Sequence, residues 1–306
     1  MIAPRLNRGD RIGVVSPSMP AARGEPKFES GVRFLRGMGF DVVIGKHVYS
    51  HTLGYTASPQ EKAADIDDMF ADESIGAIMC AQGGDTANGC LPYVEWDTIK
   101  RNPKILLGIS DITVLLNAIY TRTGLVTFHG NDVMWGLGRD PTPYDVQEFL
   151  SRLVDAEIGA VNANGTRETV RGGVAEGTLL GGNLKCLLKL AGTPYFPDLS
   201  GSILFLEALN ITPPACDYMF NQLRQIGVFE HVRGVVVGYI DGLQNDPDAS
   251  IQMEDVLLNV TGEYDFPILK VNDFGHNCPN TVLPVGAKVR VDADRQELEI
   301  LGQCVR

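Results

Sequence analysis

The sequence lacks the features that mark several specialised classes of protein. It has no hydrophobic run long enough to span a membrane, no internal repeat and no low-complexity segment. Its N-terminus has only a short apolar run after a charged turn, whereas a signal peptide carries an apolar stretch of about 7 to 15 residues. These absences predict a protein of the cytoplasm with no membrane partner.

Cysteine is sparse, and its spacing fits neither a redox motif nor a zinc site. No C-x-x-C is present, and no cysteine pairs with a histidine at zinc-finger spacing. The pattern favours free thiols in a reducing compartment, although an even number would also allow three disulfides in an exported protein. The six cysteines are Cys80, Cys90, Cys186, Cys216, Cys278 and Cys304.

Positive charge is also in short supply. The chain has 26 Lys and Arg against 38 Asp and Glu, a formal net charge of −12, which repels phosphate backbones. Nucleic acid is therefore not an expected partner. The hydrophobic share of 44% and the charged share of 21% are typical of globular proteins, and 306 residues favour two domains.

Strand and helix patterns alternate through the first half of the chain, which is typical of a parallel sheet covered by helices on both faces. Strands are predicted at 11–16, 40–44, 75–81 and 104–107, and helices at 25–38, 58–72 and 113–121. The helix at 58 has the strongest start signal: Ser58, Pro59 and Glu61 form an N-cap, a first-turn proline and a capping-box glutamate.

The pattern changes after Asp140. Residues 162–177 are polar and contain glycine, so they are interpreted as a linker or mobile loop, and the predicted domains are 1–160 and 161–306. The second half reads as a mixed β/α domain. A helix is predicted at 144–154, before this boundary. Within the second domain the predicted elements are helices after Asn183 and at 217–226 and 251–262, and strands at 202–207, 234–239, 268–271, 288–292 and 297–301.

The segment Gly108-Ile109-Ser110-Asp111 lies where a predicted strand meets a helix. A serine there projects from a tight turn, with backbone N–H groups and the positive end of the helix beside it, as an acyl-transfer nucleophile requires. The second glycine of the G-x-S-x-G motif is absent because Ile112 takes its place. Ser110 or Asp111 could equally be the N-cap of the helix.

The neighbouring strand runs into Gln82-Gly83-Gly84-Asp85. Adjacent glycines let the backbone approach a ligand and can present N–H groups as an oxyanion hole, but they also suit a tight turn. Neither a P-loop nor a well-formed dinucleotide-binding motif is present, so no nucleotide cofactor is expected.

Two further polar groups follow predicted strands. Glu207 ends the apolar Phe205-Leu206-Glu207, and His276 closes Asp273-Phe274-Gly275-His276 in a loop. A buried carboxylate needs a partner and a catalytic histidine needs an orienting acceptor, so each could satisfy the other, although each taken alone suits a solvated surface position. His129 is the rival candidate for the base.

Ser110, Glu207 and His276 together make an ordered nucleophile, acid and base set. Here the chain resembles the LD-carboxypeptidases, a serine peptidase family that includes the microcin C self-immunity peptidases. The resemblance covers nearly the whole chain. It rests on GDRIGVVSPS, AQGGDTANG, LPYVEWDTIKRNPK, GISDITVLLNAIYTRTGLVTFHG, EGTLLGGNLKCLLKLAGTPYFPDLSGSILFLE, FGH and TVLPVGAKVRVD.

The resemblance implies an N-terminal flavodoxin-like α/β domain joined to a C-terminal swivelling mixed β/α domain, and commonly a homodimer. It implies a metal-free, cofactor-free Ser-Glu-His triad of Ser110, Glu207 and His276. The oxyanion hole would use the N–H groups of Gly84 and Asp111.

The implied reaction is cleavage of an L,D amide bond in a small peptide or peptidoglycan fragment. Gly83, Asp85 and Asn88 are the predicted substrate contacts. Many cell-wall-recycling members carry R-G-G-Y-G where this chain has Gln82 to Thr86, and Asn88 brings the chain closer to the self-immunity branch.

Two other functions remain open from the sequence. A self-immunity-type amidase would act on aminoacyl-nucleotide conjugates, but residues 162–177 lack the tryptophan that stacks on the nucleotide in that branch, and Trp135 could either replace it or pack. A two-lobed protein could also bind a small ligand without catalysing any reaction.

Overall fold

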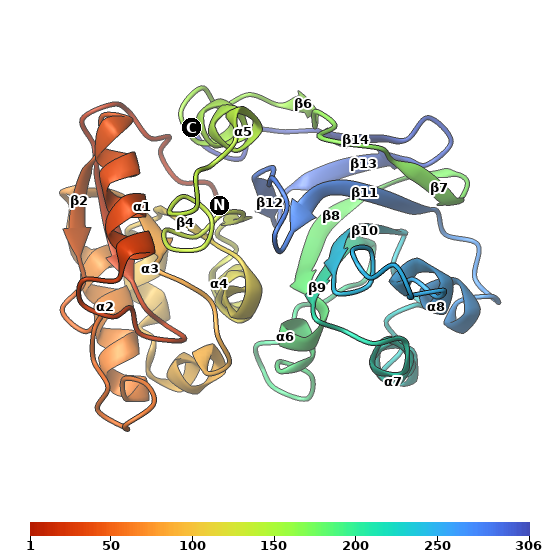
Figure 1. The fold of residues 1–306 in the computed structure, drawn as a ribbon, viewed down its shortest axis with the longest axis horizontal. Helices are drawn as coiled ribbons and strands as arrows, with labels where there is room; N and C mark the ends of the chain where they lie inside the picture. The colour runs from red at the N-terminus through yellow and green to blue at the C-terminus, as the bar shows by residue number, and fades with distance from the viewer.

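A parallel sheet organises the N-terminal half of the computed structural model, which describes all 306 residues (Figure 1). The strand order is β12-β5-β4-β3-β1-β2, and only β12 runs antiparallel, against β5. The strands are β1 (Arg11–Val15), β2 (Asp41–Ile44), β3 (Ile75–Cys80), β4 (Ile105–Gly108), β5 (Thr127–His129) and β12 (Leu283–Val285). The helices are α1 (Pro26–Gly37), α2 (Pro59–Ala71), α3 (Trp96–Arg101), α4 (Thr113–Thr123) and α5 (Pro143–Leu153), with short 3-10 turns η1 (Ala87–Tyr93) and η2 (Ser110–Ile112).

Local sequence signals start two of these helices. Ser58 caps α2 and exchanges hydrogen bonds with Glu61, as the capping box predicts. Thr142 and Asp145 form a second capping box at the start of α5. β4 is buried along its whole length, which is why its sequence is apolar without alternation.

The second half forms a mixed sheet in the order β6-β14-β13-β8-β9-β10-β11-β7. Its four central strands, β8 to β11, are parallel, and antiparallel strands flank them on both sides. The strands are β6 (Gly159–Ala160), β7 (Glu168–Arg171), β8 (Val174–Asn183), β9 (Ser202–Leu209), β10 (Gly234–Asp241), β11 (Ile268–Gly275), β13 (Lys288–Asp292) and β14 (Glu297–Ile300). The helices are α6 (Leu184–Leu188), α7 (Pro213–Gln225) and α8 (Met253–Val260).

The predicted fold class is confirmed: a parallel-sheet α/β lobe is joined to a mixed β/α lobe. α4 packs between the lobes, against β8 and α6, and the Asn117 amide exchanges hydrogen bonds with the backbone of Gly181. A single cluster of 90 buried apolar residues runs through both lobes. β6 already lies in the second sheet and β12 returns to the first, so the domain boundary after residue 160 stays a prediction.

No helix combines the length and the apolar character that crossing a lipid bilayer requires. All six cysteines are free, as their spacing predicts.

The interpretation of residues 162–177 as a linker or mobile loop is wrong. β7 and the first part of β8 lie inside this segment, and β7 pairs antiparallel with β11. β7 is polar because it is an edge strand, where charged side chains face solvent. The Arg167 guanidinium also forms a buried ion pair of 2.7 Å with Asp273, which fixes the segment against β11.

β11 is longer than predicted. It continues through Asp273 to Gly275, so only His276 and the residues after it lie in the loop that was predicted from Asn272. Buried ion pairing and hydrogen bonding of Asp273 make this polar stretch compatible with a strand.

Candidate active site

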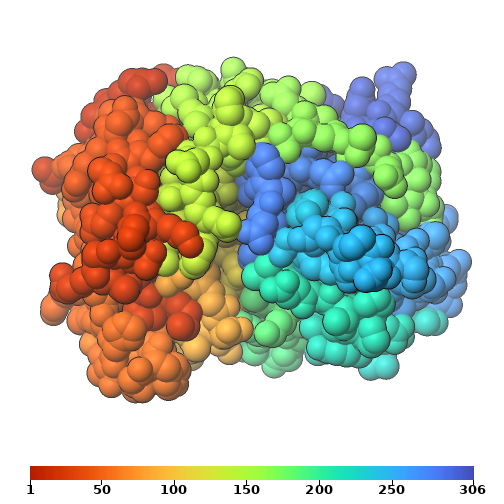
Figure 2. All heavy atoms as spheres, viewed as in Figure 1, coloured from red at the N-terminus to blue at the C-terminus, as the bar shows by residue number.

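A cavity of about 890 Å³ opens between the two lobes. The segments that line it come from both halves of the chain: residues 82–84, 109–110 and 131–145 from the first, and 209–210, 241–245 and 275–280 from the second. In Figure 2 the surface is hollowed between the yellow-green atoms of the first half and the blue and cyan atoms of the second. The cavity therefore meets the carboxyl ends of strands from both sheets, where ligands bind in α/β folds.

Ser110 lies directly after β4 in a strained backbone conformation. Its φ angle is 64°, in the left-handed region that favours glycine, so the turn is held by its surroundings. Gly83 makes room for it: a Cβ on Gly83 would lie 2.6 Å from the Ser110 Cβ and 2.8 Å from its Oγ. The sharp turn presents the Ser110 side chain to the cavity.

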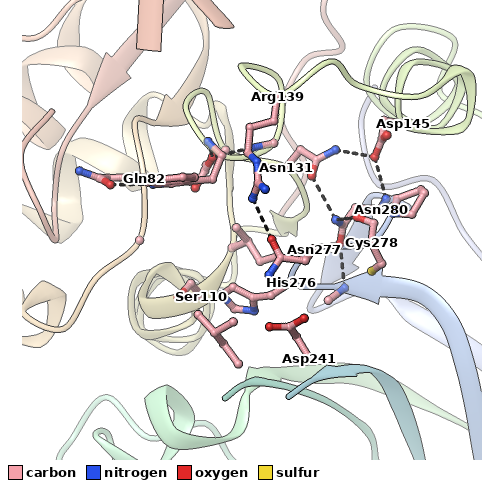
Figure 3. Close-up of a pocket in the computed structure, with 18 of the residues that line it drawn as sticks. Gln82, Ser110, Asn131, Arg139, Asp145, Asp241, His276, Asn277, Cys278 and Asn280 are labelled. Atoms are coloured by element: carbon pink, nitrogen blue, oxygen red, sulfur yellow. Dashed lines mark hydrogen bonds between the residues drawn. The ribbon is translucent and has the colours of Figure 1, made fainter. Parts of the chain in front are cut away.

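Glu207 and His276 form a short hydrogen bond at the cavity. Glu207 Oε2 lies 2.6 Å from His276 Nδ1, and the two side chains are 0% and 14% exposed. In Figure 3 the imidazole points toward Ser110. Because Nδ1 faces a carboxylate, it carries the proton, and Nε2 is left to accept one.

The electrostatics of this pair are reciprocal. Burial by itself lowers the pKa of His276, but the charge of Glu207 and the hydrogen bond to it outweigh burial, so the pKa lies above its ordinary value of 6.5. Burial by itself raises the pKa of Glu207. The charge of His276 and the hydrogen bond to it outweigh burial, so the pKa of Glu207 lies below its ordinary value. Glu207 is thus an ionised group poised to stabilise an imidazolium.

Asp111, next to Ser110, is a fully buried carboxylate with three donors. It accepts hydrogen bonds from Ser18 Oγ at 2.6 Å, the Ala87 N–H at 2.8 Å and Lys189 Nζ at 2.6 Å. Lys189 lies just after α6, so its ion pair with Asp111 ties the two lobes together beside Ser110. The N–H of Gly84, also at the cavity, donates no hydrogen bond within the chain.

An amide network fixes the loop that carries His276. Asp145 Oδ1 accepts from the Asn280 N–H at 2.7 Å and from Asn131 Nδ2 at 2.6 Å. Asn280 also accepts from the Gly275 N–H at 2.8 Å and donates to Asn131 at 3.1 Å (Figure 3). Asn280 thus ties the loop after β11 both to the first lobe and to Gly275, the residue before His276.

Two family models match the chain in succession. The LD-carboxypeptidase N-terminal domain matches residues 12–130, and the LD-carboxypeptidase C-terminal domain matches residues 176–291. The chain belongs to the LD-carboxypeptidase family. Membership of this peptidase family makes it a hydrolase and supports carboxypeptidase activity.

The relatives that align with almost the whole chain fall into two groups by name, carboxypeptidases and a self-immunity protein. A probable murein peptide carboxypeptidase of Bacillus subtilis is 32% identical over 94% of this chain and 90% of its own length. The microcin C7 self-immunity protein MccF of Escherichia coli is 30% identical over 99% of this chain and 96% of its own length. A solved structure of MccF in complex with glutamyl sulfamoyl guanosine superposes with a TM-score of 0.92 at 28% identity, covering 100% and 99% of the two chains.

In this LD-carboxypeptidase, only one of the three predicted substrate contacts lies at the cavity. Gly83 lines the cavity, but Asp85 and Asn88 do not. The Asp85 side chain is 73% exposed and pairs with Lys185 at 3.5 Å, and Asn88 is an exposed residue of η1. The structure therefore gives no support for substrate contact by Asp85 or Asn88.

His129, the rival base, does not line the cavity. It is fully buried in β5, edge-on to Phe205 and Phe274, and neither ring nitrogen has a hydrogen-bond partner. Burial lowers its pKa to about 4, so it stays neutral. Of the five histidines, only His276 lines the cavity.

Trp135 lies at the cavity with 44% of its surface exposed. Its indole N–H donates to Gln82 Oε1 at 2.9 Å, and Lys27 Nζ lies 3.9 Å from the ring centre. The side chain is held in place yet offers ring surface to a ligand.

Sequence reasoning missed the groups that hold this site in place. Their contacts join residues far apart in the chain, so short sequence motifs do not reveal them; these groups are Lys189, Asn131, Asp145 and Asn280. Only Asp145 has a local signal, the capping box that it forms with Thr142.

Proposed function

We propose that the protein is a serine carboxypeptidase that cleaves the amide bond between an L-residue and a terminal D-residue, as in murein tetrapeptides. The observation that carries the proposal is the 2.6 Å contact between Glu207 and His276 at a cavity that Ser110 also lines, in its strained turn. An ionised acid, an oriented base and a presented hydroxyl are the parts that acyl transfer by serine needs.

In the proposed mechanism, His276 Nε2 takes the proton of Ser110 as the hydroxyl attacks the scissile carbonyl. Glu207 stabilises the imidazolium that forms. The N–H groups of Gly84 and Asp111 hold the oxyanion, a contribution of roughly 3 to 4 kcal/mol for each donor in comparable enzymes. His276 then gives its proton to the departing amine, and water hydrolyses the acyl-enzyme.

The biological setting follows from the family resemblance. We further propose that the protein acts as a homodimer in the cytoplasm and recycles peptidoglycan fragments. The relative from Bacillus subtilis, named as a probable murein peptide carboxypeptidase, supports a murein peptide as the substrate.

A self-immunity-type amidase is the second candidate. The likeness to MccF in complex with glutamyl sulfamoyl guanosine favours it, as does the exposed ring of Trp135 at the cavity, on which a base could stack. This function would use the same Ser110, His276 and Glu207 on an aminoacyl-nucleotide conjugate.

Side-by-side incubation with a murein tetrapeptide and an aminoacyl sulfamoyl adenylate tests the proposal. Mass spectrometry should detect release of the terminal D-alanine from the tetrapeptide, at a kcat/KM well above that for the adenylate. The opposite preference would give the function to the amidase, and no hydrolysis of either would contradict both.

The pH profile should report the pair of Glu207 and His276. We expect kcat/KM to rise as His276 loses its proton, with a midpoint above 6.5, because Glu207 raises the pKa of His276. In Glu207→Gln the charge is gone and burial remains, so the midpoint should move to lower pH while the rate falls. Initial rates from pH 5 to 9 measure this. An identical midpoint in both proteins would contradict the assigned roles.

A further inference from the structure

The charges around the cavity are strongly unequal. Four of the residues that line it are aspartates: Asp132, Asp140, Asp145 and Asp241. Arg139 is the only Lys or Arg among the lining residues. A guanidinium stays protonated at any pH the protein meets, so Arg139 is the cavity's only permanent cation.

Arg139 reaches from the first lobe to the residue beside His276. Its Nη1 donates to Asn277 Oδ1 at 2.8 Å, and its guanidinium carbon lies 5.6 Å from the Trp135 ring centre. Its Nε and Nη2 have no acceptor within the chain, and it forms no ion pair with a carboxylate. An arginine that is held at one nitrogen and open at the others is suited to a planar anion.

Three of the four aspartates are already engaged by donors of the protein. Asp132 accepts the N–H groups of Trp135 and Gly136, Asp145 belongs to the amide network, and Asp241 accepts from Asn245 Nδ2 at 2.9 Å. Asp241 lies on the opposite side of His276 from Arg139 in Figure 3, and its carboxylate repels an anion there. Asp140, the fourth aspartate, is exposed to solvent, which screens its charge, so a negatively charged ligand group is favoured only beside the Arg139 guanidinium.

We propose that Arg139 binds the terminal carboxylate of the departing residue and so restricts the enzyme to the last bond of a peptide. This inference rests on the proposed carboxypeptidase function, because a substrate of that class always ends in a carboxylate. It also sets the direction of the chain in the cavity. The departing residue lies beside Arg139, and the acyl part of the substrate lies toward Asp241.

The test compares a murein tetrapeptide with the same peptide carrying a C-terminal amide. Ser110→Ala protein, which needs no turnover to report binding, is titrated with each peptide by calorimetry. The free acid should bind about 10- to 100-fold tighter than the amide, in line with a hydrogen-bonded charge pair. The Ser110→Ala/Arg139→Gln protein should bind the two peptides with about equal affinity.

Lys27→Gln is the matched control. It removes a positive charge that also packs on Trp135 but does not line the cavity, so the preference for the acid should persist. Fluorophosphonate labelling of Ser110 in the Arg139→Gln single variant checks that loss of the bond to Asn277 leaves the serine reactive.

The outcomes separate the two proposals. Two results would overturn the role of Arg139. One is a preference for the acid that survives Arg139→Gln. The other is no preference in the Ser110→Ala protein with Arg139 intact, which includes the case in which it binds neither peptide. If the preference depends on Arg139 but the protein with Ser110 intact hydrolyses no tetrapeptide, the carboxylate site stands and the proposed reaction is refuted.

Discussion

Replacing Ser110 by alanine should abolish hydrolysis and leave the fold intact. In a triad the hydroxyl is the atom that attacks, and loss of a serine nucleophile lowers kcat about a millionfold in a well-studied serine protease. The rate of D-alanine release from a murein tetrapeptide measures this, with thermal unfolding as the check on folding. A Ser110→Ala protein that keeps the parent rate would contradict the assignment.

Glycine at the same position separates activity from stability. Ser110 has a φ of 64°, a conformation that costs most residues about 1 kcal/mol or more and glycine almost nothing. Ser110→Gly should therefore be as inactive as Ser110→Ala but about 1 kcal/mol more stable. Loss of fluorophosphonate labelling in both variants, against labelling of the parent, would also argue against a purely ligand-binding protein.

Removing the ammonium of Lys189 should destabilise the protein by about 3 kcal/mol, because it leaves a buried charge without its partner. Asp111 is fully buried, and Lys189 Nζ lies 2.6 Å from it. Ser18 and the Ala87 N–H would still donate to the carboxylate, but neither carries a charge. Chemical denaturation of Lys189→Met measures the loss.

Lys185→Met is the matched control, on α6, the helix that Lys189 directly follows. Lys185 is 65% exposed and pairs with the exposed Asp85 at 3.5 Å, a pair worth less than about 1 kcal/mol. Asp111→Asn in the Lys189→Met background should recover part of the loss, since both charges are then absent. A Lys189→Met protein as stable as Lys185→Met would show that this ion pair does not hold the lobes.

The elements that the sequence predicts well have local signals. Ser58 and its capping box place the start of α2, and apolar runs place β3, β4 and β9 to within a few residues. Because the carboxyl ends of parallel strands face a common crevice, polar residues after strands were sound site candidates. Ser110, Glu207 and His276 each lie at or near the end of a strand.

What the sequence does not predict depends on contacts between distant residues. The edge strand β7 is polar, so it resembles a loop until its partner β11 is known. Arg139 has no local signal, and its contact with Asn277, the residue after His276, follows from a loop of one lobe reaching a loop of the other. Periodicity and caps describe elements, whereas these groups are set by how the elements pack.

The single antiparallel strand of the first sheet has a consequence for how the chain acquires its structure during synthesis. β5 is paired on its outer side only by β12, which is made of residues 283–285. Until residues 283–285 have left the ribosome, the β5 edge has no partner and remains open to other chains. A nascent N-terminal half should therefore need the help of chaperones rather than complete its folding ahead of the rest.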